Sequence, residues 1–428
     1  MVESKSLALL GGVPVITNSF KKYTTLDETD EAVVIKVFRS GNLSKFLGDA
    51  GDFFLGGPEV RDFEDSFSKL LNVKYAVSVN SWTSGLWAAI GSLELEPGSE
   101  VITSSWTMAA TATTILHWNC APVFADIDRR TFNLDVKSVE DNITTRTRAI
   151  VSPDIFGQSA DIESLRHLCN EYNLALVSDT AQAPMATRNG YFAGTASDVA
   201  GFSFNYHKHI HTGEGGMLVT NDLEILDRLQ LLRNHGEVAI SRRKSRDKKY
   251  GIMGMNMRLG EIEAALGTNQ IQKLEKAVVS RRNAAKRFTT GIQNLHGLST
   301  PHVDFGNDHV YYVYGMTIDH KVIEVDRDKI IDALRAEGVP GLIAGYQNLH
   351  KLPLFGEQLT YKNNALPYTL LPKNRAKELR NQKLPVAEQL HNLNFIGLNW
   401  CAFELANEEI DQLIEAFIKV WDNLRFLR

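Results

Sequence analysis

The chain has 428 residues, a net charge of -5, 43% hydrophobic residues and 23% charged residues. This length suits a large α/β domain with a smaller partner domain, and the composition is that of a globular enzyme rather than of a disordered or fibrous chain. The acidic balance argues against a nucleic-acid binder, and no apolar run approaches the roughly 18 residues that a membrane helix needs. The amino-terminal residues lack a signal-peptide pattern, and three distant cysteines match neither a disulfide framework nor a zinc site, so we expect a cytoplasmic protein.

Short apolar runs alternate with helical patterns from residue 74 to about residue 235. The expected strands are 74–79, 101–103, 122–127, 148–153, 174–179, 199–204 and 216–221. Helical patterns are expected at 83–95, 108–118, 163–173 and 223–235. This alternation predicts a mostly parallel sheet covered by helices on both faces, which places functional groups at the carboxyl ends of the strands.

The rest of the chain has a different pattern. A basic stretch at 241–251 reads as a solvated loop, or alternatively as a loop that contacts an anionic substrate. A long helix is expected over 259–288, followed by a strand at 309–319 and a terminal helix at 407–424. We therefore expect a large domain at 1–290, which includes the amino-terminal segment, and a smaller αβ domain at 291–428.

Lys208 is the first candidate for chemistry. It lies in SFNYHKHIHTGEGG (203–216), between an expected strand and a glycine-rich turn. Burial and neighbouring positive charge would disfavour its ammonium form and favour the nucleophilic amine.

Asp179 ends an expected strand and alone would be read as a turn cap. Together with an activated lysine it fits pyridoxal 5'-phosphate (PLP), which needs a Schiff-base lysine and an acid that keeps its pyridinium nitrogen protonated. Gln182 follows three residues later and is placed to hydrogen-bond the hydroxyl of the ring.

A phosphate site is expected where the first strand meets its helix. Thr83 and Ser84 stand at the helix entry, where backbone amides and hydroxyls bind phosphate well. The same pattern also describes an ordinary Ser/Thr helix cap. Ser203 precedes Lys208 by five residues and offers a further hydroxyl.

Taken in order, these motifs resemble the DegT/DnrJ/StrS sugar aminotransferase family, whose members are PLP enzymes of aspartate-aminotransferase fold (fold type I). The resemblance covers nearly the whole chain. Lys208 with GEGG is its most specific motif, and the others are FLGGPEVRDFEDSF (54–67), SWTSGL (81–86), PVFADID (122–128), SDTAQAP (178–184), NMRLGEIEAALG (256–267) and LPVAEQL (384–390).

The resemblance implies roles for single residues. Lys208 would be the Schiff-base lysine and general base, Asp179 the pyridinium partner and Gln182 the ring-oxygen partner. Thr83, Ser84 and Ser203 would hold the phosphate. Asn256 would bind the phosphate in the neighbouring subunit, which implies a homodimer with shared active sites.

Two positions depart from the family pattern. Trp82 stands where glycine is usual, so the phosphate loop is expected to differ in shape from that of the family. The aromatic residue that commonly stacks on the cofactor ring matches Met108 here, and we expect Trp106, two residues earlier, to take its place.

Three histidines, His207, His209 and His211, would share one face of an extended segment, so a metal site has to be weighed. Since no carboxylate or cysteine lies nearby at ligand spacing, we expect no metal and assign the histidines to pocket shape or packing.

The expected reaction is a ping-pong transfer of an amino group from L-glutamate to a sugar carbonyl. The motifs SSWTMAATAT and NYHKHIHTGEGG resemble the branch that makes 8-amino-3,8-dideoxy-manno-octulosonate from 3-deoxy-8-oxo-manno-octulosonate for lipopolysaccharide. The alternatives are amination of a nucleotide-linked keto-deoxysugar and, less favoured because Lys208 is present, a PLP-dependent sugar dehydratase. A ligand-sensing relative without activity is a further alternative.

Overall fold

The computed structural model describes residues 6–48, 51–236, 252–362 and 364–428. The basic stretch at 241–251 lies outside the described residues. In the described part of the chain no helix is long and apolar enough to cross a membrane.

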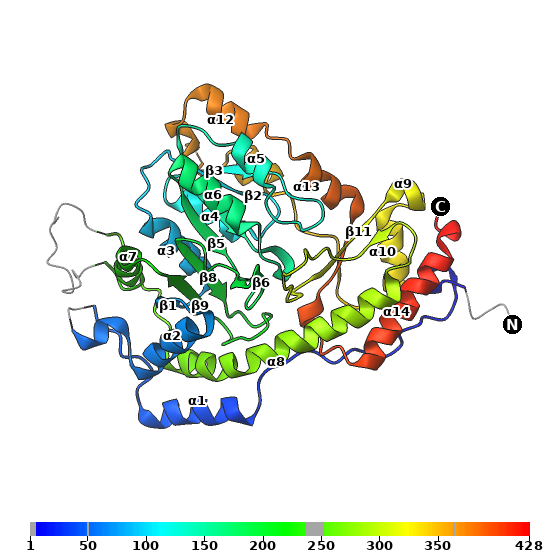
Figure 1. Ribbon diagram of the computed structural model, residues 1–428, viewed down its shortest axis with the longest axis horizontal. Helices are drawn as coiled ribbons and strands as arrows, with labels where there is room; N and C mark the ends of the chain where they lie inside the picture. Colours follow the sequence, from blue (N-terminus) through cyan, green and yellow to red (C-terminus); the bar gives the residue numbers. More distant parts are fainter. Residues whose placement is uncertain (1–5, 49–50, 237–251, 363) are drawn as a thin grey trace.

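A seven-stranded sheet forms the centre of the molecule (Figure 1). Its strand order is β1-β9-β8-β5-β4-β2-β3, and only β9 runs antiparallel to its two neighbours. Its strands are β1 (Tyr75–Val79), β2 (Glu100–Ser104), β3 (Ala121–Ala125), β4 (Thr147–Pro153), β5 (Ala175–Asp179), β8 (Val199–Ser203) and β9 (Gly216–Thr220). All seven coincide with expected strands, and the predicted α/β architecture is confirmed.

Helices cover both faces of this sheet because successive side chains of a strand point to opposite sides. Val77 and Val79 of β1 pack with α3 (Trp82–Ser92) and α7 (Leu223–Arg233) on one face. Ala76 of the same strand packs on the other face with α2 (Pro58–Leu71) and α8 (Glu261–Ile292). Further helices beside the sheet are α4 (Ala109–His117), α5 (Val136–Asp141) and α6 (Ile162–Tyr172). Helix α1 (Glu28–Ser40) packs on α8. A short hairpin, β6 (Thr187–Arg188) and β7 (Tyr191–Phe192), lies apart from the sheet.

A second sheet of four short strands follows, in the order β10-β11-β13-β12. Its strands are β10 (Leu298–Ser299), β11 (Tyr314–Ile318), β12 (Leu342–Ile343) and β13 (Phe395–Leu398). The accompanying helices are α9 (His320–Ile323), α10 (Arg327–Ala336), α11 (Pro353–Gly356), α12 (Lys373–Arg380), α13 (Pro385–Gln389) and α14 (Asn407–Asp422). Helix α8 runs from beside α2 to α14 and so connects the two sheets (Figure 1).

The strand expected over 309–319 is shorter than its sequence pattern indicates. Only 314–318 pair within the sheet, because the preceding backbone bonds a different segment. The amides of Val310 and Tyr312 donate to Gly157 and Phe156, 2.8 and 2.9 Å away. Tyr311 adopts a positive φ of 52°, so the chain turns here instead of continuing the strand.

The amino-terminal segment packs on the carboxyl-terminal part of the chain. Leu7, Ile16 and Phe20 belong to the apolar cluster built around β11, β13 and α14, and the amide of Ile16 donates to the carbonyl of Glu337 at 2.9 Å. The domains expected at 1–290 and 291–428 stay a prediction, and this packing joins the amino-terminal segment to residues of the second. Apolar contacts of a short segment depend on tertiary packing, which its sequence does not specify.

Candidate active site

The main cavity opens where three parallel strands end. Pro153, Asp179 and Ser203, the last residues of β4, β5 and β8, all line it. Pro153 and Asp179 are direct partners in the sheet register. The cavity therefore lies at the carboxyl edge of the sheet, where α/β sheets bind their ligands.

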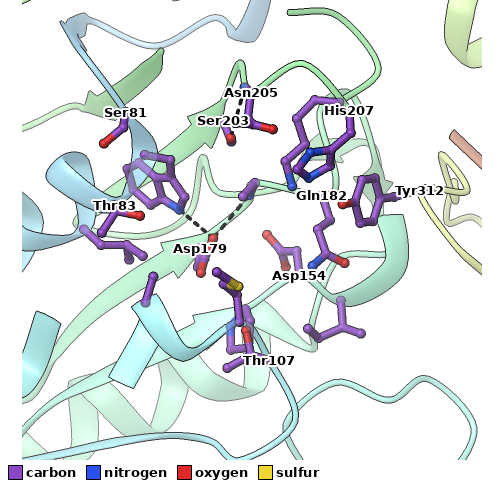
Figure 2. Close-up of a pocket in the computed structure, with 18 of the residues that line it drawn as sticks. Ser81, Thr83, Thr107, Asp154, Asp179, Gln182, Ser203, Asn205, His207 and Tyr312 are labelled. Carbon is purple, nitrogen blue, oxygen red and sulfur yellow. Dashed lines mark hydrogen bonds between the residues drawn. The ribbon is translucent and has the colours of Figure 1, made fainter. Parts of the chain in front are cut away.

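The amino terminus of α3 forms one end of this cavity. Ser81 is the helix cap, with its Oγ accepting from the amide of Ser84 at 3.1 Å, and both Ser81 and Thr83 line the cavity. The hydroxyl of Ser84 lies 2.9 Å from that of Ser81, and Ser84 is not among the lining residues. Ser203 and Asn205 lie across from this helix entry (Figure 2).

The glycines of the GEGG motif allow this close approach. A Cβ atom on Gly216 would lie 2.8 Å from both the carbonyl carbon of Ser81 and the nitrogen of Trp82. Strand β9 therefore begins directly against the backbone of the helix cap, which only glycine permits.

Lys208 is buried within the cavity, with 8% of its surface exposed. Its Nζ lies 4.4 Å from the centroid of the Tyr312 ring. Burial lowers the pKa of Lys208 to about 8, against the opposing effect of the Asp179 carboxylate. The amine is thus closer to its neutral, nucleophilic form than that of a solvated lysine.

Asp179 accepts hydrogen bonds on both carboxylate oxygens. The indole Nε1 of Trp82 donates to Oδ1 at 2.6 Å, and the hydroxyl of Thr111 donates to Oδ2 at 2.8 Å. The backbone amide of Ala181 adds a longer bond of 3.3 Å to Oδ1. These three donors fix the orientation of the carboxylate.

Gln182 lies in the same cavity with its amide oriented by two neighbours. Its Oε1 accepts from the amide of Phe156 at 2.8 Å, and its Nε2 donates to the hydroxyl of Tyr346 at 2.7 Å. Tyr346 stacks on Phe156, with ring centroids 5.8 Å apart. Burial raises the pKa of Tyr346 to about 12, so its hydroxyl keeps its proton.

Besides Ser84, two expected site residues lie outside the cavity. Trp106 is fully buried among aromatic residues, with the ring centroids of Phe395 and Phe132 at 5.4 and 6.1 Å, whereas Met108 lines the cavity and is 61% exposed. Our expectation that Trp106 covers the cofactor ring is therefore corrected, because the core holds its side chain. Asn256 is exposed and is not a lining residue of this chain's cavity.

The three histidines do not share a face, because the chain turns through residues 206–210 instead of extending. His207 lines the cavity, and burial, reinforced by Lys208, lowers its pKa to about 4. His209 is buried, with Nε2 2.8 Å from the carbonyl of Val310. Among the described residues no group of three or more His, Cys, Asp or Glu side chains is arranged to hold a metal ion.

Other lining residues were missed by the sequence reasoning. Asp154 lines the cavity, and burial raises its pKa to about 7. It directly follows β4, much as Asp179 ends β5, so its position after an expected strand could have identified it from the sequence. Tyr312 and Tyr346 come from the carboxyl-terminal part of the chain. No local pattern predicts their arrival at this cavity.

The chain was compared with known proteins. The model of the DegT/DnrJ/EryC1/StrS aminotransferase family matches residues 43–391. The chain belongs to this family. It is 35% identical over 339 residues to the spore coat polysaccharide biosynthesis protein SpsC of Bacillus subtilis (strain 168), which covers 78% of this chain and 84% of SpsC.

Two further similarities agree. The chain is 32% identical over 350 residues to GDP-perosamine synthase of Vibrio cholerae, covering 81% of this chain and 91% of that enzyme. The structure of PseC from Helicobacter pylori, an aminotransferase involved in the biosynthesis of pseudoaminic acid, superposes with a TM-score of 0.77 at 26% identity and covers 95% of this chain and 99% of PseC. The predicted family, fold type and enzyme class are confirmed: the protein is a sugar aminotransferase that takes an amino group from a donor to a keto sugar.

The cavity also fits the cofactor of this enzyme class, PLP. It combines a buried amine with no ion pair among the described residues, a hydrogen-bonded carboxylate at a strand end and a helix entry in contact with a glycine backbone. These are the groups that the aldehyde, the ring nitrogen and the phosphate of PLP require.

Proposed function

We propose that Lys208 is the cofactor-binding lysine and the general base of the reaction. The observation that carries this proposal is the position of its buried amine in one cavity with Asp179 and the entry of α3. When bound, PLP supplies an electron sink for the carbon whose amino group is transferred. The remaining steps belong to side chains of the protein.

Asp179 would face the ring nitrogen and Gln182 the ring oxygen. Asp179 is already oriented by Trp82 and Thr111, and Gln182 by the amide of Phe156, so neither side chain needs to reorganise to bind. Such preorganisation stabilises the charge that develops in the transition state, because no side chain has to reorient during the reaction.

Thr83, Ser84 and Ser203 would bind the phosphate. Thr83 and Ser203 line the cavity, which supports their assignment, and Ser81 joins them as the helix cap. Ser84 would contribute its backbone amide or turn its hydroxyl from Ser81 toward the phosphate. For Asn256, exposed on this chain, we propose a contact with the phosphate of a second subunit in a homodimer.

Lys208 would move the proton between the substrate carbon and the cofactor. Its lowered pKa leaves the amine able to take that proton near neutral pH, and a base is most effective when its pKa lies near the working pH. Lys208 also separates this protein from a dehydratase that carries histidine at this position, since the neighbouring His207 lies in the cavity beside the lysine and not in its place.

The donor we propose is L-glutamate, and the acceptor is a sugar carbonyl. The sequence motifs favour 3-deoxy-8-oxo-manno-octulosonate as the acceptor. Its amination would be a step of lipopolysaccharide synthesis in the cytoplasm. Similarity to GDP-perosamine synthase favours a nucleotide-linked keto-deoxysugar instead. We therefore propose the shared chemistry, amination of a keto or aldehydo sugar, and leave the acceptor to experiment.

The experiment supplies nitrogen-labelled L-glutamate with each acceptor in turn and follows the label by mass spectrometry. The Lys208→Ala variant is expected to lose turnover, whereas Lys36→Ala, which removes an exposed lysine, keeps it. Label in the octulosonate product alone supports the first acceptor, and label in the nucleotide sugar alone rejects it. Full turnover by Lys208→Ala would overturn the assignment of the lysine.

A further inference from the structure

Trp82 makes a contact that a smaller residue could not make. Its indole Nε1 donates to Oδ1 of Asp179 at 2.6 Å. The indole is 5% exposed and lines the cavity beside the carboxylate. The phosphate loop keeps its helix cap despite the large residue, because the side chain turns from the helix entry toward the sheet.

Two glycines provide the space for the indole. A Cβ on Gly201 would lie 1.8 Å from Cζ3 of Trp82, and a Cβ on Gly85 would lie 2.5 Å from its Cε3. Neither glycine has a positive φ, so backbone conformation does not explain them. Glycine inside a helix or strand is unfavourable, and accommodation of the indole is the physical reason for both.

The sheet register brings this space to Asp179. Gly201 of β8 is the direct partner of Asp179 of β5, so a side chain lying over Gly201 lies next to the carboxylate. The indole N–H therefore reaches Asp179 as a consequence of where it packs, and Thr111 binds the other oxygen at 2.8 Å. Each oxygen of the Asp179 carboxylate thus accepts a side-chain hydrogen bond. The carboxylate still has lone pairs that can accept from a further donor.

We propose that Trp82 is a positioning residue that holds the Asp179 carboxylate aimed at the ring nitrogen of the cofactor. This inference rests on the proposed role of Asp179. Hydrogen bonds to a carboxylate stabilise its charge, and a fixed negative charge favours the protonated form of a facing nitrogen. Loss of the indole N–H would weaken the contact with the nitrogen and leave contacts with the phosphate and aldehyde unchanged.

The test compares the binding of two ligands to the apoenzyme: PLP and its deaza analogue, in which carbon replaces the ring nitrogen. Trp82→Phe keeps an aromatic ring but lacks the donor. We expect it to lower the affinity for PLP about tenfold, as removal of one hydrogen bond to a charged group does, and to leave the affinity for the analogue unchanged. Equal losses for both ligands, or no loss for either, would overturn the inference.

Two further variants keep the test decisive if Trp82→Phe does not fold. Thr111→Val removes the second donor with little change in shape, and Gly201→Ala displaces the indole without touching a polar group. Both are expected to reduce the preference for PLP over the analogue, and an unchanged preference in both would reject the inference.

Asp179→Asn separates this inference from the proposed function. If it abolishes the preference for PLP while Trp82→Phe does not, only the role of Trp82 fails. If Asp179→Asn leaves the preference intact, the assignment of Asp179 itself is wrong.

Discussion

The amine of Lys208 is held in an environment that opposes its charge. Burial lowers its pKa to about 8 from the 10.5 of a solvated lysine, so the folded protein binds this proton less tightly than the unfolded chain does. Burial therefore favours the neutral, nucleophilic amine. It also lowers the stability of the apoenzyme at every pH at which the folded protein keeps Lys208 protonated.

Lys208→Met is expected to stabilise the apoenzyme at neutral pH. Below pH 8 both states of the wild type carry the proton, and the variant gains up to about 3 kcal/mol in free energy of unfolding. The gain should fade as the pH rises from about 8 to 10.5, because the folded protein releases the proton near pH 8 and the unfolded chain only near 10.5. Urea unfolding across this pH range measures it, and a gain independent of pH would contradict the assigned pKa.

The chemical residues at strand ends could be predicted from the sequence, and their supporting contacts could not. Asp179 ends a recognisable strand pattern and Lys208 follows one, so their positions at the cavity could be inferred from local sequence, and their roles stay predictions. The indole of Trp82 lies over Gly201, 119 positions away, and Gln182 bonds the hydroxyl of Tyr346, 164 positions away. Contacts over such separations depend on packing alone. For the same reason Trp106 was misplaced, since its neighbour Phe395 is remote in the chain.

At the scale of single elements, the residue that caps α3 also faces the cavity. Ser81 caps the helix through the amide of Ser84 and also lines the cavity. The sequence predicted a helix start here, and whether it served as a plain cap or as a phosphate site stayed open. The structure places the cap in the cavity, so one residue is able to serve both purposes.

Ser81→Ala is expected to lower the free energy of unfolding by about 1 kcal/mol through loss of the cap. It should also weaken the binding of PLP but not that of pyridoxal, which lacks the phosphate. Asp135→Ala provides the matched control, because Asp135 caps α5 through the amide of Ser138. The control should lose similar stability with PLP affinity unchanged, as measured by urea unfolding and ligand titration. Equal loss of PLP and pyridoxal in Ser81→Ala would argue against a phosphate contact.

Across the whole molecule, the amino-terminal segment is tied to the carboxyl-terminal part by one buried carboxylate. Glu337 accepts from the amides of Ala8 and Val15 at 2.8 and 3.1 Å, and its ion pair with Lys419 of α14 measures 2.8 Å. The alternating strand and helix patterns predicted the large sheet well because they are local. This long-range connection has no such local pattern, so the sequence alone does not predict where residues 7–20 pack.

Glu337→Ala is expected to destabilise the protein by about 3 kcal/mol, since it leaves a largely buried ammonium group without its partner. PLP affinity should stay unchanged because Glu337 is not a lining residue of the cavity. Asp411 lies on α14, as Lys419 does, and forms an exposed ion pair with Arg287. The Asp411→Ala variant should therefore change the free energy of unfolding by less than about 1 kcal/mol. Thermal unfolding compares the two variants, and similar effects from both would contradict the structural role of Glu337.

The central claim is that the buried amine of Lys208 binds PLP and lets the protein take an amino group from a donor. The visible absorption spectrum of the purified protein with PLP, recorded before and after addition of L-glutamate alone, tests it most directly. We predict a yellow band that glutamate replaces with the near-ultraviolet band of the aminated cofactor, and no such band from lysine-bound cofactor in Lys208→Ala. An identical band and response in Lys208→Ala, or no band in the wild type after PLP is added, would contradict the account.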